Sequence, residues 1–109
     1  MNSVLLSGRV NFWPKSFVTV DNTRHTHFQL EITHFVAAER RTELYPVQAW
    51  NRVAELAAEL KPGQRVLVRG YLTRNLHDEI EVVAAELFRD VEQEGIEQQM
   101  EDGQDGPSD

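Results

Sequence analysis

Apolar and polar residues alternate along several short stretches of the chain, and this alternation predicts strands. Within residues 25–35, Phe28, Leu30 and Ile32 fall on one face, and polar residues fall between them. A strand of this kind buries one face and exposes the other, which is typical of an antiparallel sheet with one solvent-exposed face. Similar patterns predict four further strands over residues 3–10, 43–50, 65–74 and 79–88.

Two residues inside the predicted strands restrict how those strands pair. Pro46 has no N–H to donate to a neighbouring strand, so it belongs at a sheet edge, at a bulge or at a point where the strand changes partners. Gly70 has no side chain, and it permits a sharp bend or a close approach of another backbone.

A short helix is predicted between the third and fourth strands. Val53, Leu56, Ala57 and Leu60 recur at helical spacing, Asn51 is expected to cap the helix, and the sequence Lys-Pro-Gly-Gln ends it. The helix has only about three turns, which is too few for a crossover between parallel strands. This order of elements predicts an all-β fold, the five-stranded Greek-key barrel called the OB-fold, with the helix as a plug at its bottom.

The net charge of −7 is distributed unevenly along the 109 residues. Residues 90–109 hold eight acidic residues and no Lys or Arg, which leaves ten acidic and eleven basic residues in residues 1–89. We therefore predict an OB-fold domain over residues 1–89 and an acidic tail over residues 90–109, disordered from about Glu92 onward. The tail is either a solvating appendage or a segment that competes with nucleic acid or recruits a partner.

Several classes of protein are disfavoured by features that the chain lacks. It has no cysteine, so disulfides, Cys-ligated zinc and thiol chemistry are not available. Its first residues have neither the basic region of a signal peptide nor the length of a membrane span, which favours a cytoplasmic protein. A Gly-rich phosphate loop, a nucleophile with a matched base and a paired acidic motif are all missing, so we expect no enzyme and no cofactor.

Four histidines bring a metal site into consideration. His25 and His27 are two residues apart and therefore point to one face of a strand. No carboxylate pair or thiol stands at a spacing that completes a set of ligands. We therefore expect polar surface histidines rather than a metal site.

Two segments resemble the bacterial single-stranded DNA-binding protein family. The opening MNSVLLSGRV has that family's Met and Asn, apolar run and Gly-Arg. The segment AWNRVAELAAELKPGQRVLVRGYLTR has its aromatic residue, apolar helix, Lys-x-Gly and Gly-x-Leu-x-Thr-Arg, and with the final strand the resemblance covers most of residues 1–89. The resemblance implies an OB-fold that binds single-stranded DNA without strong sequence preference, in replication, repair or recombination, and that is a homotetramer in most relatives.

Binding a single strand requires cationic side chains for the phosphates and flat side chains on which bases stack. Trp50 retains an aromatic residue where the family has one, and Trp13, beside Pro14 in a loop, is a second candidate. The candidate cations are Arg9, Arg69 and Arg74 on strands or strand ends, and Arg40 and Arg41 in the expected turn between the second and third strands.

The sequence departs from the family in its other aromatic positions. The positions of the family's stacking tryptophans fall on Leu44, near Leu76, and near Phe35 or Val36. We therefore expect weaker binding than a typical relative shows. Such a chain is a divergent member of the family or a relative of the primosomal PriB proteins, which also use short-looped OB domains.

The loops and the tail depart from the family as well. The segments VAAERRTE and NLHDE are shorter than the family's two long loops, so less protein is available to wrap a strand. The tail is acidic but ends in QDGPSD, without the Pro-Phe ending that docks on repair and replication enzymes. Recruitment of the family's usual partners is therefore in question.

A second hypothesis is an OB-fold adaptor that has lost DNA binding and acts through protein contacts. The missing aromatic residues favour the adaptor, whereas the retained arginines and the family signature favour DNA binding, which we prefer. Under both hypotheses we expect a homotetramer or a homodimer, because a small OB domain leaves strand edges that need pairing. The expected partners are single-stranded DNA, further copies of the chain and, through the acidic tail, replication or repair proteins.

Overall fold

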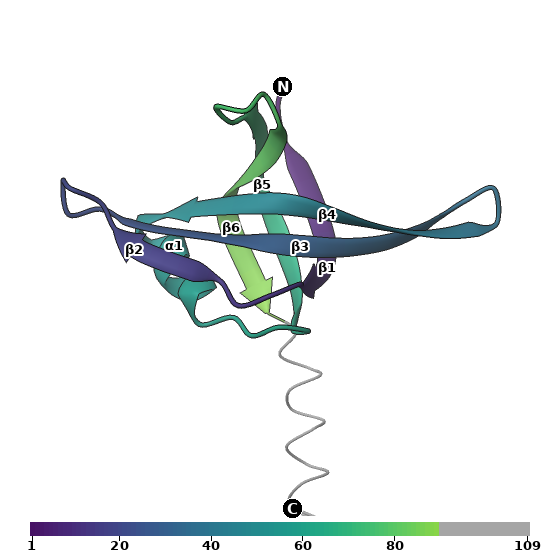
Figure 1. Cartoon of the computed structure of the whole chain (residues 1–109), viewed down its shortest axis with the longest axis horizontal. Helices are drawn as coiled ribbons and strands as arrows, with labels where there is room; N and C mark the ends of the chain where they lie inside the picture. The colour runs from purple at the N-terminus through teal and green to yellow at the C-terminus, as the bar shows by residue number, and fades with distance from the viewer. Residues whose placement is uncertain (90–109) are drawn as a thin grey trace, which may run out of the picture.

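The chain forms a small barrel of strands with one helix at its end and one long hairpin that reaches beyond it (Figure 1). The computed structural model describes residues 1–89, whose strands form one sheet of order β1-β5-β6-β4-β3-β2, closed by a further pairing of β1 with β3. None of the helical structure in these residues has the length and apolar composition of a membrane span. The elements are β1 Val4–Val10, β2 Lys15–Val18, β3 Arg24–Val36, β4 Glu39–Trp50, α1 Asn51–Ala58, β5 Arg65–Arg74 and β6 Ile80–Arg89.

The predicted OB-fold is confirmed, and the predicted strands correspond to β1, β3, β4, β5 and β6. The additional strand is β2, which pairs with the start of β3 and places Lys15 opposite His27 and Phe17 opposite His25. All four residues of β2 are exposed, so no alternation of apolar and polar residues marked it in the sequence. β2 extends the sheet beside the barrel and brings Phe17 to the surface of β3.

The barrel is filled by aliphatic side chains, and the helix closes it as predicted. Burying each large aliphatic side chain contributes about 1.5 to 3 kcal/mol. Thr26 of β3 is also buried, and its Oγ1 donates a hydrogen bond to the carbonyl oxygen of Ala54, 2.8 Å away, which joins the sheet to α1. The buried core includes Val10, Leu30, Val47, Val68 and Val82 from five strands, and Ala54, Ala57 and Leu60 from the helix and the residues after it.

Pro46 and Gly70 both stand where strand pairing changes, as predicted. Pro46 pairs with Gln29 of β3, and the next residue of β4 begins a parallel pairing with β6. The register between β5 and β6 shifts between Arg69 and Gly70, and a Cβ atom on Gly70 would lie 1.9 Å from the carbonyl oxygen of Val83. The absence of a side chain therefore allows the two strands to approach at the bulge.

The start of α1 differs from the prediction that Asn51 caps the helix. Trp50 occupies the N-cap position without a side-chain hydrogen bond, and Asn51 is the first helical residue, with a φ of 56°. Asn adopts this left-handed conformation more readily than most residues do. The chain therefore turns from β4 directly into α1, and Trp50 remains partly exposed at the end of the strand.

The predicted turn over residues 36–43 is wrong, because most of that segment is strand. The pairing of β3 with β4 continues without interruption to Val36 opposite Glu39. Only Ala37 and Ala38 form the turn, and their φ values of 52° and 68° are those of a type I′ turn. This turn has the backbone twist that continues two strands as one hairpin, which explains how the hairpin becomes so long.

As a consequence, Arg40 and Arg41 lie in β4 rather than in a loop. The pairing of β1 with β3 ends at Arg9 opposite Glu31, and the hairpin continues past this point. We call residues 32–44 the distal hairpin. Figure 1 shows it projecting away from the barrel, on the side opposite to α1.

Candidate nucleic-acid interface

β3 and β4 present one continuous row of side chains that faces away from the barrel core. Their alternate residues, such as Phe28, Leu30 and Val47, are buried in the core. At about 3.3 Å per residue, the ten steps along the strand from Arg40 to Trp50 span roughly 33 Å. We call this row the outer face, and it consists of the cross-strand pairs His25–Trp50, His27–Gln48, Gln29–Pro46, Glu31–Leu44, Thr33–Thr42 and Phe35–Arg40.

Three rings from three strands form a row at the end of the outer face nearest α1. The ring centroid of His25 lies 5.0 Å from that of Phe17 and 4.1 Å from that of Trp50. Phe17 and Trp50 remain 49% and 41% exposed, whereas His25 between them is 8% exposed. We call these three residues the aromatic row. It offers flat, accessible ring surface of the kind on which bases stack.

A chain of two hydrogen bonds, which starts at a ring nitrogen of His25, holds the central ring of this row in place. His25 Nε2 lies 2.8 Å from Oε1 of Gln48, and the amide nitrogen of Gln48 in turn donates to the carboxylate of Glu81. The other ring nitrogen, Nδ1, is buried and has no hydrogen-bond partner in residues 1–89. The prediction of surface histidines is therefore wrong for His25, because β2 and Trp50 cover a ring that lies on an otherwise exposed face.

His27 lies one pair further along the outer face, with its ring centroid 5.9 Å from that of His25. Partial burial lowers its pKa below the ordinary 6.5, and the nearby His25 and Lys15 lower it further. Within residues 1–89, no three histidine, aspartate or glutamate side chains gather closely enough to hold a metal ion. The rings of His25 and His27 therefore lie next to each other along this part of the outer face.

Among the predicted cations, Arg40 lies on the outer face, at the end far from Trp50. It is exposed and makes no ion pair or hydrogen bond to another described residue, and Phe35 lies directly opposite it in β3. Arg41 points to the other face of the hairpin, where its Nη2 lies 3.4 Å from Oε1 of Glu39. The structure therefore separates two arginines that the sequence placed together in a turn.

The other predicted arginines have partners within the chain. Nη1 of Arg9 donates to the carbonyl oxygen of Gly63 at 2.9 Å, and Arg69 forms an ion pair with Glu86. This pair raises the pKa of Arg69 and lowers that of Glu86. Exposed ion pairs of this kind contribute little to stability, so a phosphate could replace the carboxylate.

Arg74 is also paired, because its Nη1 lies 3.6 Å from the carboxylate of Asp78 and 2.7 Å from the carbonyl oxygen of the same residue. Arg69 and Arg74 both belong to β5, and β6 lies between β5 and β4 in the sheet. These two arginines are therefore not on the outer face.

The sequence identified one of the exposed aromatic residues outside the aromatic row, Trp13, which lies 58% exposed in the link between β1 and β2. Two other exposed aromatic residues were not recognised as binding candidates. Phe17 was missed because it belongs to the strand that no pattern marked. Phe35 was considered only as the counterpart of a lost family tryptophan, yet it is 70% exposed and lies beside Arg40. An exposed aromatic residue in an alternating strand is the signal that could have identified it.

Two further arginines lie near the aromatic row, at a shallow pocket of about 450 Å³ between the β2–β3 turn and the start of α1. Nη1 of Arg24 donates to Oγ of Ser16 at 3.0 Å. Arg52 follows Trp50 by two residues and is exposed. The pocket is lined by Val18, Asn22, Arg24, Asn51, Arg52 and Glu55, so cationic charge is available at this end of the outer face as well.

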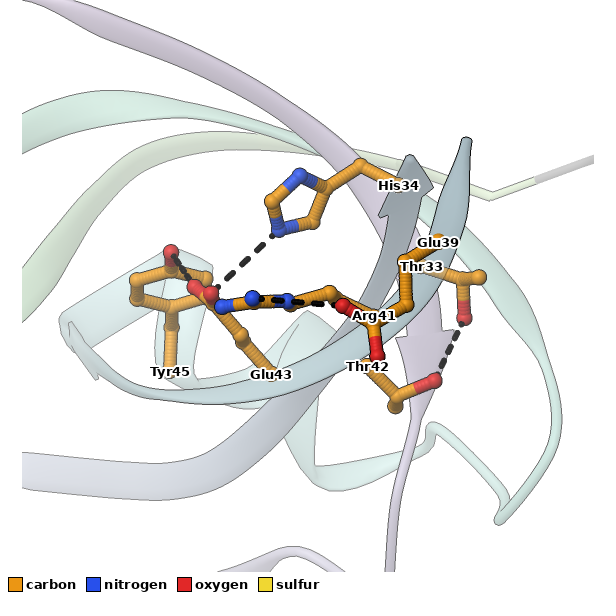
Figure 2. A network of polar contacts seen from close by, with 7 residues as sticks. All are labelled: Thr33, His34, Glu39, Arg41, Thr42, Glu43 and Tyr45. Atoms are coloured by element: carbon orange, nitrogen blue, oxygen red, sulfur yellow. Dashed lines mark hydrogen bonds and ion pairs between the residues drawn. The ribbon is translucent and has the colours of Figure 1, made fainter. Parts of the chain in front are cut away.

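The opposite side of the distal hairpin carries a polar network, drawn in Figure 2. Nε2 of His34 lies 3.3 Å from the carboxylate of Glu43, which also accepts a hydrogen bond from the hydroxyl of Tyr45. The hydrogen bond from Tyr45 is the largest cause that lowers the pKa of Glu43, and the hydrogen bond from His34 is the second. The Glu43 carboxylate therefore stays charged. The hairpin therefore has a charged side and an outer face with aromatic residues at both ends.

Comparison with known proteins gives one family for most of the chain. Residues 1–88 match the model of the single-strand binding protein family. A curated relative, the single-stranded DNA-binding protein of Mycoplasma pneumoniae, is 28% identical over 110 residues. That match includes 90% of this chain and 66% of the relative, so this chain spans just under two thirds of the relative's length.

Solved structures agree with this match. The wild-type single-stranded DNA binding protein from Thermus aquaticus is 28% identical with a TM-score of 0.74, over 100% of this chain and 43% of that chain. A deletion mutant of the same protein is 31% identical with a TM-score of 0.72, over 82% of this chain and 40% of that chain. The SSB domain of a protein from Synechococcus sp., 22% identical with a TM-score of 0.67 over 80% of this chain and 93% of that chain, shares the fold.

Proposed function

Since the chain belongs to the single-strand binding protein family, we propose that it binds single-stranded DNA, without strong sequence preference, along the outer face. The observation that carries this proposal is the aromatic row, in which Trp50 and Phe17 are half-exposed. Arg24 and Arg52 lie near this row. Each base stacked on such a ring contributes about 1 to 3 kcal/mol. Stacking tolerates any base, because every base has a flat face, and this explains the absence of sequence preference.

In the proposed complex, the strand runs from the aromatic row toward Phe35 at the tip of the distal hairpin. Trp13 offers a further exposed ring beside the start of β2. Arg40 binds a phosphate at the tip because no carboxylate competes for it within residues 1–89. The remaining predicted cations, Arg9, Arg41, Arg69 and Arg74, bind phosphate only after giving up a present partner.

The wider role that we propose is support of DNA replication, repair or recombination by a cytoplasmic, non-enzymatic homo-oligomer. The domain boundary at residues 89 and 90 belongs to the same proposal. The acidic tail, residues 90–109, lies outside the described residues, and its charge of −8 suits competition with DNA for the arginines or recruitment of a replication or repair protein.

The decisive experiment is fluorescence anisotropy of labelled oligo-dT with the full chain and with a chain that lacks residues 90–109, across a salt series. We expect binding that weakens with salt at a logarithmic slope of about 0.7 per phosphate neutralised. We expect the shortened chain to bind more tightly, because eight acidic residues are removed. Absence of binding by both chains at low salt contradicts the proposal.

That negative outcome would favour the second candidate function, an OB-fold adaptor that binds proteins. The observation in its favour is that four of the seven predicted site residues, Arg9, Arg41, Arg69 and Arg74, already contact other groups of the chain. The free position of Arg40 and the exposed aromatic row favour DNA binding over this alternative.

A further inference from the structure

The distal hairpin leaves one edge of β4 without a strand partner in residues 1–89. β4 pairs with β3 along its whole length, but with β6 only at Val47 and Gln48. The other edge of β4 is therefore open from Glu39 to Pro46. A strand edge of this kind presents backbone N–H and C=O groups in the geometry that binds another strand.

The turn determines which residues of β4 use their backbone groups at this open edge. In a two-residue hairpin, the residues that flank the turn, here Val36 and Glu39, exchange hydrogen bonds, and bonded and non-bonded pairs then alternate. The N–H and C=O groups of Arg40, Thr42 and Leu44 consequently point away from β3. The type I′ turn bounds this set on one side, and Pro46, which has no N–H, bounds it on the other.

We propose that this edge binds the same edge of a second copy of the chain, antiparallel and centred on Thr42. In this register the backbone of Thr42 exchanges hydrogen bonds with that of Thr42 in the other copy, and the backbone of Arg40 exchanges them with that of Leu44 in the other copy. The outward N–H and C=O groups of Arg40, Thr42 and Leu44 are then all hydrogen-bonded in both copies. On the charged side of the hairpin, Arg41 of each copy faces Glu43 of the other as a non-bonded pair, in which side chains approach most closely.

The charges of Arg41 and Glu43 favour this register over the two registers that are shifted by two residues. Sliding one copy by two residues preserves the backbone pattern but places either Arg41 opposite Arg41 or Glu43 opposite Glu43. Like charges directly opposite each other destabilise a strand pair, and opposite charges stabilise it. The hydrogen bonds that Glu43 makes with Tyr45 and His34 keep it ionised for this pairing. The sequence of this edge therefore complements itself in one register.

The expected association is weak, because only a few residues of each copy take part. An interface of this size falls below that of stable complexes, so it forms at high local concentration, as when two copies occupy one DNA strand. Pairing at this edge places the two outer faces side by side in one sheet, with Arg40 of one copy next to Leu44 of the other. The occupation of one DNA strand by two copies and the joined DNA-binding surface rest on the proposed function, whereas the pairing of the two edges does not.

Single cysteines provide the test, since the natural chain has none. Paired residues in a hydrogen-bonded position have Cα atoms about 5.5 Å apart, within the range that a disulfide spans. Thr42→Cys in the full chain should therefore form disulfide-linked dimers under mild oxidation. The matched control is Thr33→Cys, because Thr33 lies opposite Thr42 on the same face, with its Oγ1 3.2 Å away, but one strand further from the edge (Figure 2).

We expect T42C to cross-link at least about tenfold faster than T33C on gels without reductant. Adding R41E to T42C places Glu opposite Glu43 and should slow cross-linking severalfold, and the exchange R41E/E43R should restore it. Equal rates for T42C and T33C overturn the proposal, and so does an R41E effect that the exchange does not reverse. Because no DNA is present, failure here leaves the proposed DNA binding standing, and success does not depend on it.

Discussion

The ring centroid of His25 lies 4.1 Å from that of Trp50, across the last pair of the β3–β4 ladder. The hydrogen bond to Gln48 and the edge contact with Phe17 hold the histidine ring from the other directions. Trp50 is thus supported on one side and accessible on the other. A ring fixed in this way loses little conformational entropy when a base stacks on it, and this favours binding.

Replacing Trp50 with Ala should weaken oligo-dT binding more than any other single aromatic substitution in the chain. Loss of one stacked base costs about 1 to 3 kcal/mol, which corresponds to roughly 5- to 150-fold in Kd. Trp50→Phe should retain most of the affinity because it keeps a flat ring. Anisotropy at fixed salt measures both variants. Trp13→Ala serves as the comparison, and equal affinities of W50A and the natural chain would show that Trp50 does not contact DNA.

Arg40 and Arg69 should differ in their effect on DNA binding. Arg40 is unpaired among the described residues and lies on the outer face, whereas Arg69 is paired with Glu86 on β5. Arg40→Gln should reduce the logarithmic salt slope by about 0.7, equivalent to one phosphate contact. Arg69→Gln, which removes the same charge, should leave the slope nearly unchanged. A larger change for R69Q than for R40Q would place the DNA on β5 instead.

The lowered pKa of His27 should make the folded chain less stable in mild acid than at neutral pH. Its pKa in the folded chain is held below 6.5 by burial and then by His25 and Lys15, so the unfolded chain takes up a proton that the folded chain resists. This contribution is present above pH 6.5 and is lost as the pH falls through that value toward the folded pKa. NMR titration of the His27 ring should give a midpoint below 6.5.

Urea unfolding at a series of pH values provides the second measurement, and His27→Gln provides its control. The decrease in unfolding free energy between about pH 8 and pH 5 should be smaller for H27Q, because the variant has one fewer group whose pKa changes on folding. A His27 midpoint at or above 6.5 would contradict the expected effect of its surroundings.

Gly70→Ala should destabilise the barrel strongly. The added Cβ would lie 1.9 Å from the carbonyl oxygen of Val83, so the backbone of β5 or β6 must move at the bulge. We expect a loss of about 3 kcal/mol in unfolding free energy. Gly63→Ala is the control: its φ of 85° makes alanine unfavourable by about 1 kcal/mol, but no atom lies within 4 Å of the new carbon. Similar losses in the two variants, measured by urea unfolding, would show that the crowding at Gly70 is readily relieved.

Local sequence was sufficient for much of the fold. The alternation around Phe28 and Leu30 predicted β3, and helical spacing from Val53 to Leu60 predicted α1, because both patterns depend on which side of one element is buried. Pro46 and Gly70 marked changes in strand pairing for equally local reasons, a missing N–H and a missing side chain. Trp50 was identified as a candidate binding residue from the family resemblance.

The tertiary structure decided what depends on pairing between distant residues. β2 has no pattern of its own and exists because β3 provides a ladder for it. Arg40 and Arg41 separated onto opposite faces because a two-residue turn at Ala37 and Ala38 extended the hairpin, and a strand alternates its side chains. His25 became buried only because registers placed Phe17 and Trp50 on either side of it. Strand register is set between segments far apart in the chain, so no pattern within one segment contains it.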